Sequence, residues 1–244
     1  MLVLAVHGSA APAAAATVRR LTAAIEALSG IRAVVGHLDV QRPCLAEVVR
    51  EHPHAVVVPL LLGDGYHRRV DVPAVLEGTD CVLTEGLSGE REITLALYER
   101  LREAERRRGA WLRADAVVVA GAGSSRPGGN AGTAHCAERL AALLEYDRAP
   151  GPAVPVVPAH LTSAGPTVPE AVSALRAAGH ERIAVAAHLL APGRFTRALA
   201  ASDAWTVSDP LADHPRVARL VLARYEAHES GRGTRRSRAA RLAA

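Results

Sequence analysis

The chain has 244 residues, of which 49% are hydrophobic, 22% charged and 3% aromatic, and its formal net charge is +4. This apolar fraction excludes general disorder, and no apolar run reaches the roughly 20 residues that a membrane-spanning helix needs. We therefore expect a soluble globular protein with no membrane partner, built as one large domain or as two domains of about 120 residues each.

The basic charge is concentrated at the C-terminus. All 29 basic residues of the chain are arginines, and residues 230–244 contain five of them and no acid. Without this segment the net charge falls from +4 to −1 (4 − 5). We therefore expect residues 230–244 to form an arginine-rich disordered tail. We expect no specific nucleic-acid partner, because aromatic residues that could stack on bases are sparse.

The three cysteines, Cys44, Cys81 and Cys136, are scattered and odd in number. They form neither a disulfide framework nor a CxxC zinc motif, which indicates reduced thiols. The N-terminal apolar run has no basic segment before it and stops at His7, unlike the hydrophobic region of a signal peptide. These features predict a cytoplasmic location.

Short apolar runs alternate with amphipathic helical patterns along the chain. A helical pattern from Thr17 to Leu28 ends at Gly30, and another covers Ile93 to Arg107. Apolar strands alternating with helices are typical of parallel sheets covered on both faces, so the sequence predicts an α/β fold. The predicted strands are Leu2–Val6, Ala33–Leu38, Ala55–Leu61, Cys81–Leu83, Ala116–Ala120, Val154–Val157, Ile183–Ala187 and Trp205–Val207.

An internal repeat divides the chain into two parts. The pattern His-Leu-x4-Pro-x3-Glu-x-Val begins at His37 and again at His160, an offset of 123 (160 − 37). Similar offsets relate other segments in the same order. Chance similarity between stretches of biased composition is the alternative explanation. We predict two homologous α/β halves, residues 1–110 and 114–229.

Two histidines of the first half are missing from the second. Aligning the Gly-Ser pairs that follow the first strand of each half places Ala122 opposite His7. Aligning the two Leu-Leu-x-x-Gly segments places Phe195 opposite His67. A structural role in each half would not explain this difference, whereas a single active site in the first half would.

His7 and His67 each follow a predicted strand of the first half. The carboxyl ends of parallel strands open on one edge of the sheet, so both imidazoles can face one cleft. Imidazole binds first-row divalent metals and titrates near neutral pH, so the pair can hold a metal, accept protons, or do both. Two solvated loop histidines are the alternative.

Three small residues lie beside these histidines and are candidate substrate contacts. Gly8 lets the backbone turn and approach a ligand closely. Ser9 either caps the next helix or donates a hydrogen bond to a ligand. Gly65 lies in the loop that leads to His67.

Charged residues follow His67 directly. Asp71 lies four residues on, where it can orient the imidazole, but it can equally mark the start of a helix. Arg68 and Arg69 suit a ligand with carboxylates, because guanidinium groups bind carboxylates through paired hydrogen bonds. Ordinary surface arginines are the alternative for both.

Two segments resemble a known family. The first strand with His7, followed by Pro-Leu-Leu-Leu-x-x-Gly-x-His-x3-Asp-x-Pro between Pro59 and Pro73, is similar to the sirohydrochlorin chelatases of the CbiX/SirB type, in the class II chelatase superfamily. The closing segment from Pro210 to Ala227 is similar too, so the resemblance covers nearly the whole chain apart from the tail. It implies two flavodoxin-like lobes with a cleft between them.

The resemblance also implies an activity. Such enzymes insert Fe²⁺, Co²⁺ or Ni²⁺ into sirohydrochlorin for siroheme or cobalamin synthesis, with the metal as a substrate and no permanently bound cofactor. The family's two active-site histidines fall on His7 and His67, as metal ligands and catalytic bases. Ala122 and Phe195 depart from that pattern, as in asymmetric two-lobed members.

The substrate implied by the resemblance carries many carboxylates, which would give Arg68 and Arg69 a binding role. A non-catalytic two-lobed carrier of metal or tetrapyrrole is the competing function. Fusion of two lobes in one chain is compatible with a monomer or a homodimer.

Overall fold

The computed structural model describes residues 1–147, 151–162 and 165–242, with side chains as far as residue 229. Its strands are β1 (Leu2–Val6), β2 (Ala33–His37), β3 (Val56–Pro59), β4 (Val82–Leu83), β5 (Ala116–Gly121), β6 (Val156–His160), β7 (Ile183–His188) and β8 (Thr206–Val207). Its helices are α1 (Pro12–Ser29), α2 (Leu45–Glu51), the π-helix η1 (His67–Asp71), α3 (Val72–Leu76), α4 (Arg91–Arg108), α5 (Ala131–Tyr146), α6 (Val168–Ala177), α7 (Arg194–Ala200) and α8 (Pro215–Leu242).

The described strands form two four-stranded parallel sheets with the same topology. One has the order β2-β1-β3-β4 and the other the order β6-β5-β7-β8. The central strands β1 and β5 are buried along their whole length, because nearly every residue in them is apolar. The predicted α/β fold with two related flavodoxin-like lobes is confirmed, and each predicted strand overlaps an observed one.

Helices cover both faces of each sheet. On one face of the first sheet, Leu45 and Val48 of α2 and Val72 of α3 pack against alternate residues of β1 and β3. On the corresponding face of the second sheet, α6 and α7 pack against β5 and β7 in the same way. The other faces of both sheets belong to one continuous apolar core that extends across the two halves.

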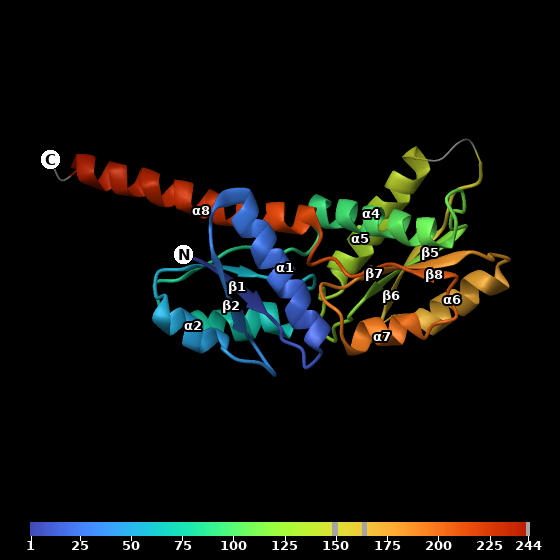
Figure 1. The fold of residues 1–244 in the computed structure, drawn as a ribbon, viewed down its shortest axis with the longest axis horizontal. Helices are drawn as coiled ribbons and strands as arrows, with labels where there is room; N and C mark the ends of the chain where they lie inside the picture. Colours follow the sequence, from blue (N-terminus) through green and yellow to red (C-terminus); the bar gives the residue numbers. More distant parts are fainter. Residues whose placement is uncertain (148–150, 163–164, 243–244) are drawn as a thin grey trace.

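The last helix of each half packs on the sheet of the other half. Helix α4 contacts β7 and β8, and helix α8 contacts β3 and α1. Figure 1 shows α8 over the side of the molecule that holds β1 and β2, and α4 over the side that holds β5 and β7. Leu97 and Leu101 of α4, with Val217 and Val221 of α8, are fully buried in the shared core. The two repeats thus exchange their final helices.

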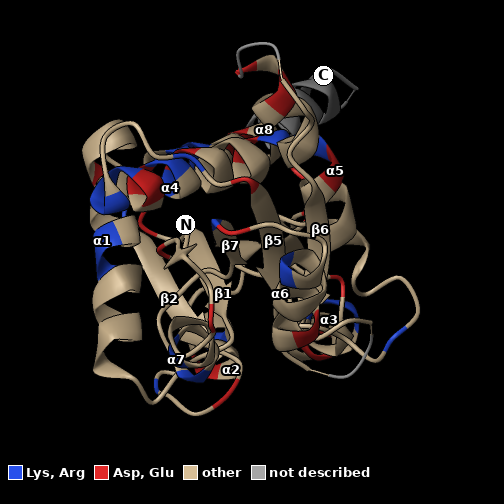
Figure 2. Ribbon diagram, turned by 90° about the vertical axis from the view of Figure 1, so that its right-hand side faces the viewer, with Lys and Arg blue, Asp and Glu red and all other residues tan. Residues whose placement is uncertain are grey.

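Ion pairs link these exchanged helices in a nearly two-fold arrangement. Arg100 of α4 donates to Asp213, just before α8, at 2.8 Å, and Arg224 of α8 donates to Glu90, just before α4. The two arginines are related by the repeat, with an offset of 124 (224 − 100). Figure 2 shows basic and acidic residues interspersed along this layer. The repeat therefore extends from sequence to the contacts that hold the halves together.

The C-terminal segment differs from the expectation. Helix α8 continues to Leu242, so residues 230–242, predicted to be disordered, prolong a helix instead. The arginines and alanines of residues 235–242 are strong helix formers, whereas the glycines at 231 and 233 are not, so composition accounts for only part of this helix. Within the described residues, no helix combines the length and the apolar character needed to cross a membrane.

Two equivalent glycines make the turns that follow β1 and β5. Gly8 has φ 97° and Gly123 has φ 91°, a region that disfavours side chains. A Cβ atom added at Gly8 would lie 2.1 Å from the Asp39 carbonyl oxygen, and one added at Gly123 would lie 2.1 Å from that of Thr162. Both the backbone conformation and the space therefore require glycine.

We expect Gly123→Ala to destabilise the protein more than Gly128→Ala in the same loop. Gly128 also has a positive φ of 74°, but nothing lies within 4 Å of an added Cβ atom. The strain of positive φ should cost each variant about 1 kcal/mol, and the clash with Thr162 should cost Gly123→Ala about 2 kcal/mol more. Urea unfolding measures both. Equal losses would show that the close contact does not constrain the turn.

His188, at the end of β7, is a buried polar residue. Only 2% of it is exposed, its Nδ1 lies 3.1 Å from Thr133 Oγ1, and its buried Nε2 has no hydrogen-bond partner among the described residues. Burial lowers the pKa of His188 to about 4. The equivalent position in the first half is Leu60, so this histidine is particular to the second half.

His188 should make the protein less stable in mild acid. Its pKa is about 4 in the fold, against 6.5 in the unfolded chain, so its contribution is complete above pH 6.5 and is lost as pH falls toward 4. Between pH 7.5 and pH 5 the wild type should lose about 2 kcal/mol more unfolding free energy than His188→Leu. Chemical denaturation at the two pH values measures this difference.

The control is His135→Leu on α5, whose histidine is half exposed. This variant keeps His188, so the loss of stability assigned to His188 should remain. A His188→Leu variant with the same loss as the wild type would contradict the buried, neutral state of His188.

Candidate metal-binding active site

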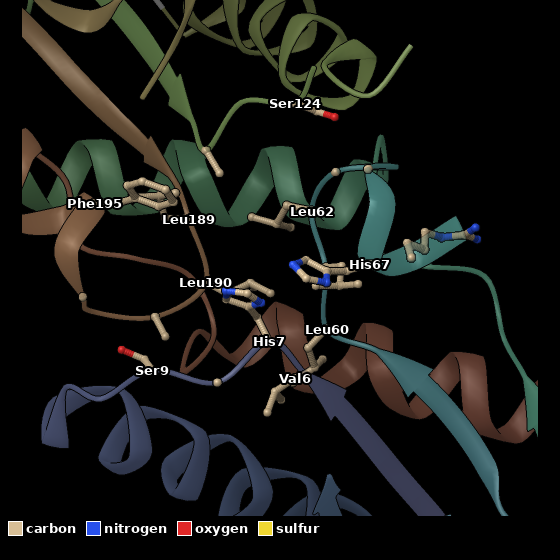
Figure 3. A pocket seen from close by; sticks show the side chains of 18 of the residues that line it. Val6, His7, Ser9, Leu60, Leu62, His67, Ser124, Leu189, Leu190 and Phe195 are labelled. Carbon is tan, nitrogen blue, oxygen red and sulfur yellow. The ribbon is translucent and has the colours of Figure 1, made fainter. Parts of the chain in front are cut away.

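A cleft of about 660 Å³ opens where the carboxyl ends of β1, β3, β5 and β7 face each other. Both halves contribute to its wall, and Figure 3 shows side chains entering it from both sides. The described lining residues include histidines and arginines but no aspartate or glutamate. The carboxyl edge of a parallel sheet is the usual ligand site of this architecture, and here the two edges share one space.

The structure brings His7 and His67 together in this cleft. His7 directly follows β1, and His67 begins the π-helix η1, which lies in the connection after β3. The centroids of their rings are 4.6 Å apart and the ring planes are inclined at 47°. Figure 3 shows the two imidazoles side by side. This is the juxtaposition expected from the parallel strands.

Asp71 fixes the orientation of His67. Its Oδ2 lies 2.6 Å from Nδ1 of His67, across the single turn of η1. Because a carboxylate only accepts hydrogen bonds, Nδ1 donates, which leaves a lone pair on Nε2 when the imidazole is neutral. Helix α3 begins directly after Asp71, as the other expectation held, but Asp71 makes no side-chain cap to it, and its hydrogen bond to His67 fits the orienting role.

The surroundings of His7 favour its neutral form. Burial of the ring lowers the pKa of His7, the nearby His67 lowers it further, and Asp39 opposes both effects. A neutral imidazole is the form that binds metals and accepts protons. Among the residues that the structure describes, no group of three or more His, Cys, Asp or Glu side chains could hold a metal ion. The histidine pair therefore offers two nitrogen ligands.

The predicted small residues Gly8, Ser9 and Gly65 line the cleft, and Ser9 and Gly65 also lie close to the other half. A Cβ atom added at Gly65 would lie 3.3 Å from Ser124 Oγ, and one added at Gly193 would lie 3.4 Å from Ser9 Oγ. These two close approaches are related by the repeat, because each brings a glycine of one half near a serine of the other. Ser9 Oγ also accepts a hydrogen bond from the backbone of Ala11 at 3.2 Å.

The arginines predicted to bind substrate lie in different environments. Arg68 lines the cleft, and its Nε lies 3.1 Å from Asp64 Oδ1. Arg69 has a side chain that is 58% exposed and does not line the cleft. Two cleft-lining arginines, Arg126 and Arg194, were not predicted. The position of Arg194 beside Phe195, opposite the His67 segment, was the only signal for either in the sequence.

Solved structures with the same fold extend over nearly the whole chain. SirB from Bacillus subtilis with Fe³⁺ has a TM-score of 0.68 at 23% identity, with 91% of this chain and 92% of that chain covered. SirB from Bacillus subtilis subspecies spizizenii in complex with cobalt has a TM-score of 0.66 at 21% identity, with 92% and 93% covered.

A third structure is that of CbiX, described as the terminal enzyme for siroheme biosynthesis in denitrifying bacteria. It has a TM-score of 0.67 at 16% identity, with 93% of this chain and 98% of that chain covered. No curated protein sequence matches the chain. The CbiX family model matches residues 1–104 and 116–228, which include both halves and the pair His7 and His67. The chain belongs to the CbiX family.

Proposed function

We propose that this protein is a sirohydrochlorin chelatase, which inserts a divalent metal ion into the tetrapyrrole sirohydrochlorin. The observation that carries the proposal is the His7–His67 pair, 4.6 Å between ring centroids, in a cleft whose described lining contains no carboxylate. The SirB structures with Fe³⁺ and with cobalt, and the CbiX structure, support the same reaction class.

The histidine pair suits transient binding of the metal substrate. Two imidazole nitrogens bind Fe²⁺, Co²⁺ or Ni²⁺ and leave the remaining coordination positions to water or to the nitrogens of the macrocycle. Asp71 holds His67 Nδ1 by a 2.6 Å hydrogen bond, so the opposite nitrogen, Nε2, is available to the metal. No permanently bound cofactor is required for this step.

The same side chains suit the removal of protons. When a divalent ion enters the macrocycle, two pyrrole N–H protons must leave, so the charge of the macrocycle core is unchanged. His7 is held neutral by burial and by His67, which makes it a proton acceptor near neutral pH. As the metal moves from the imidazoles to the pyrrole nitrogens, the freed imidazoles accept these protons.

The decisive experiment combines the protein with sirohydrochlorin and Fe²⁺, Co²⁺ or Ni²⁺ and follows the absorbance change on metal insertion. We expect His7→Ala and His67→Ala each to lower the rate by at least about 100-fold, because each removes a metal ligand and a base. His135→Ala, on the exposed side of α5, is the matched control and should keep the rate of the wild type.

The same assay separates this function from the competing one. A non-catalytic carrier would bind Co²⁺ or sirohydrochlorin without raising the insertion rate above that of the free reactants. Unchanged rates in both histidine variants would refute the site, whatever the activity of the wild type.

Asp71→Asn should weaken Co²⁺ binding by about 10- to 100-fold, the usual effect of removing a carboxylate that orients a metal-binding histidine. The amide cannot replace the charge that makes His67 Nε2 a stronger ligand. Isothermal titration with Co²⁺ measures the affinity. Asp64→Asn, which changes an acid of the same segment that contacts Arg68 instead, is the control. An Asp71→Asn affinity equal to that of the wild type would remove Asp71 from the site.

We further infer the pathway, the oligomeric state and the location of the protein. The product supplies siroheme or cobalamin synthesis, and the chain acts as a monomer or homodimer, since one chain already forms a cleft from two halves. The proposed location is the cytoplasm, in agreement with the free thiols of Cys44, Cys81 and Cys136.

A further inference from the structure

The second half, which has no counterpart of His7 and His67, carries cations that face the cleft. Three arginines line it, namely Arg68, Arg126 and Arg194. Arg68 lies 3.1 Å from Asp64 and is therefore partly neutralised. Arg126 and Arg194, both from the second half, form no ion pair with a carboxylate in the described part of the chain. Their charge is available to a ligand.

Each of these two guanidinium groups lies over an aromatic ring. The Arg126 guanidinium carbon is 5.9 Å from the centroid of Tyr66, a residue of the first half. The Arg194 guanidinium carbon is 5.1 Å from the centroid of Phe195. Stacking of this kind holds a planar guanidinium in place without using its N–H groups, which remain free to donate to a carboxylate.

An apolar group of side chains lies between the second half and the His7–His67 pair. Phe195 stands at the position equivalent to His67, and Figure 3 shows it on the α7 side of the cleft, with Leu190 and Leu62 between it and the imidazoles. The cleft therefore has a metal-binding side from the first half, and an aromatic side with an adjacent cation from the second. A flat ligand with apolar faces and anionic edges complements that division.

We propose that Arg126 and Arg194 bind carboxylates at the edge of the tetrapyrrole while Phe195 contacts its face, so that the second half positions the macrocycle for metal delivery from His7 and His67. This proposal rests on the proposed function, because it takes sirohydrochlorin as the ligand. It replaces the binding role predicted for Arg69, which lies outside the cleft lining.

The test is the binding of metal-free sirohydrochlorin, measured by quenching of its fluorescence, to Arg126→Gln, Arg194→Gln and the control Arg197→Gln. Arg197 lies on α7, exposed and outside the cleft lining. We expect the Kd of each cleft variant to rise about tenfold, the effect of losing one charged hydrogen bond, while Arg197→Gln matches the wild type. Co²⁺ affinity should be unchanged in all three variants, since the imidazoles are untouched.

Two further readouts distinguish positioning from a general loss of structure. In the insertion assay KM should rise about tenfold with little change in kcat, because the arginines contact ground state and transition state alike. Phe195→Leu should weaken binding by a similar factor at low and high salt, whereas the effect of the arginine variants should shrink as salt screens the charges.

The proposal and the function on which it rests fail in different ways. If the wild type inserts metal but the arginine variants bind sirohydrochlorin as tightly as Arg197→Gln does, the assignment of these arginines is overturned and the activity stands. If the wild type binds sirohydrochlorin through these arginines yet inserts no metal, the chelatase function fails and the positioning role stands. A wild type that does not bind sirohydrochlorin overturns the positioning role as well.

Discussion

The structure depends on the exchange of the last helix between the two halves. A four-stranded parallel sheet has two apolar faces, and the helices α2 and α3, or α6 and α7, cover only one of them. The other faces are completed by α4 packing on the second sheet and α8 packing on the first. The carboxyl edges of the two sheets are thereby held facing each other, and the cleft with its histidine pair follows from this arrangement.

Duplication allowed the two halves to differ in chemistry while sharing a backbone. The turns at Gly8 and Gly123 have the same conformation and the same close contact, because any side chain there would collide with the backbone. Positions beside these turns face the cleft and are free of that constraint. The first half has His7 where the second has Ala122, and the second half has His188 where the first has Leu60. Backbone requirements are repeated, whereas ligand-facing chemistry is not.

Much of the fold was predictable because parallel strands that are buried on both faces appear in the sequence as continuous apolar runs. Runs such as Leu2–Val6 are apolar at every position, and the strands predicted from them overlap those observed. The meeting of His7 and His67 was predictable for a related reason, since each follows a strand whose carboxyl end must open on the same edge.

Features that depend on how the halves dock were not predictable in this way. Arg126 lies in a connecting loop, and its place over Tyr66 depends on a contact between halves that no local pattern encodes. The helix exchange leaves no local signal either, because α4 has the same amphipathic pattern whichever sheet it covers. Arg69 was a candidate because it neighbours His67 in sequence, but successive residues of a helical turn point in different directions, and this one points away from the cleft.

The helix exchange also sets an order of events during synthesis. The first sheet is complete in the chain by Leu83, and α1 already packs on the face that belongs to the shared core, yet α8, which also covers that face, begins only at Pro215. When the first half has emerged from the ribosome, part of this apolar sheet face therefore stays exposed until α8 has been made. Such long-range contacts slow folding and leave partly folded chains prone to aggregation. The arrangement that gives one chain a two-sided cleft thus makes its N-terminal half dependent on a helix that follows the second sheet in the chain.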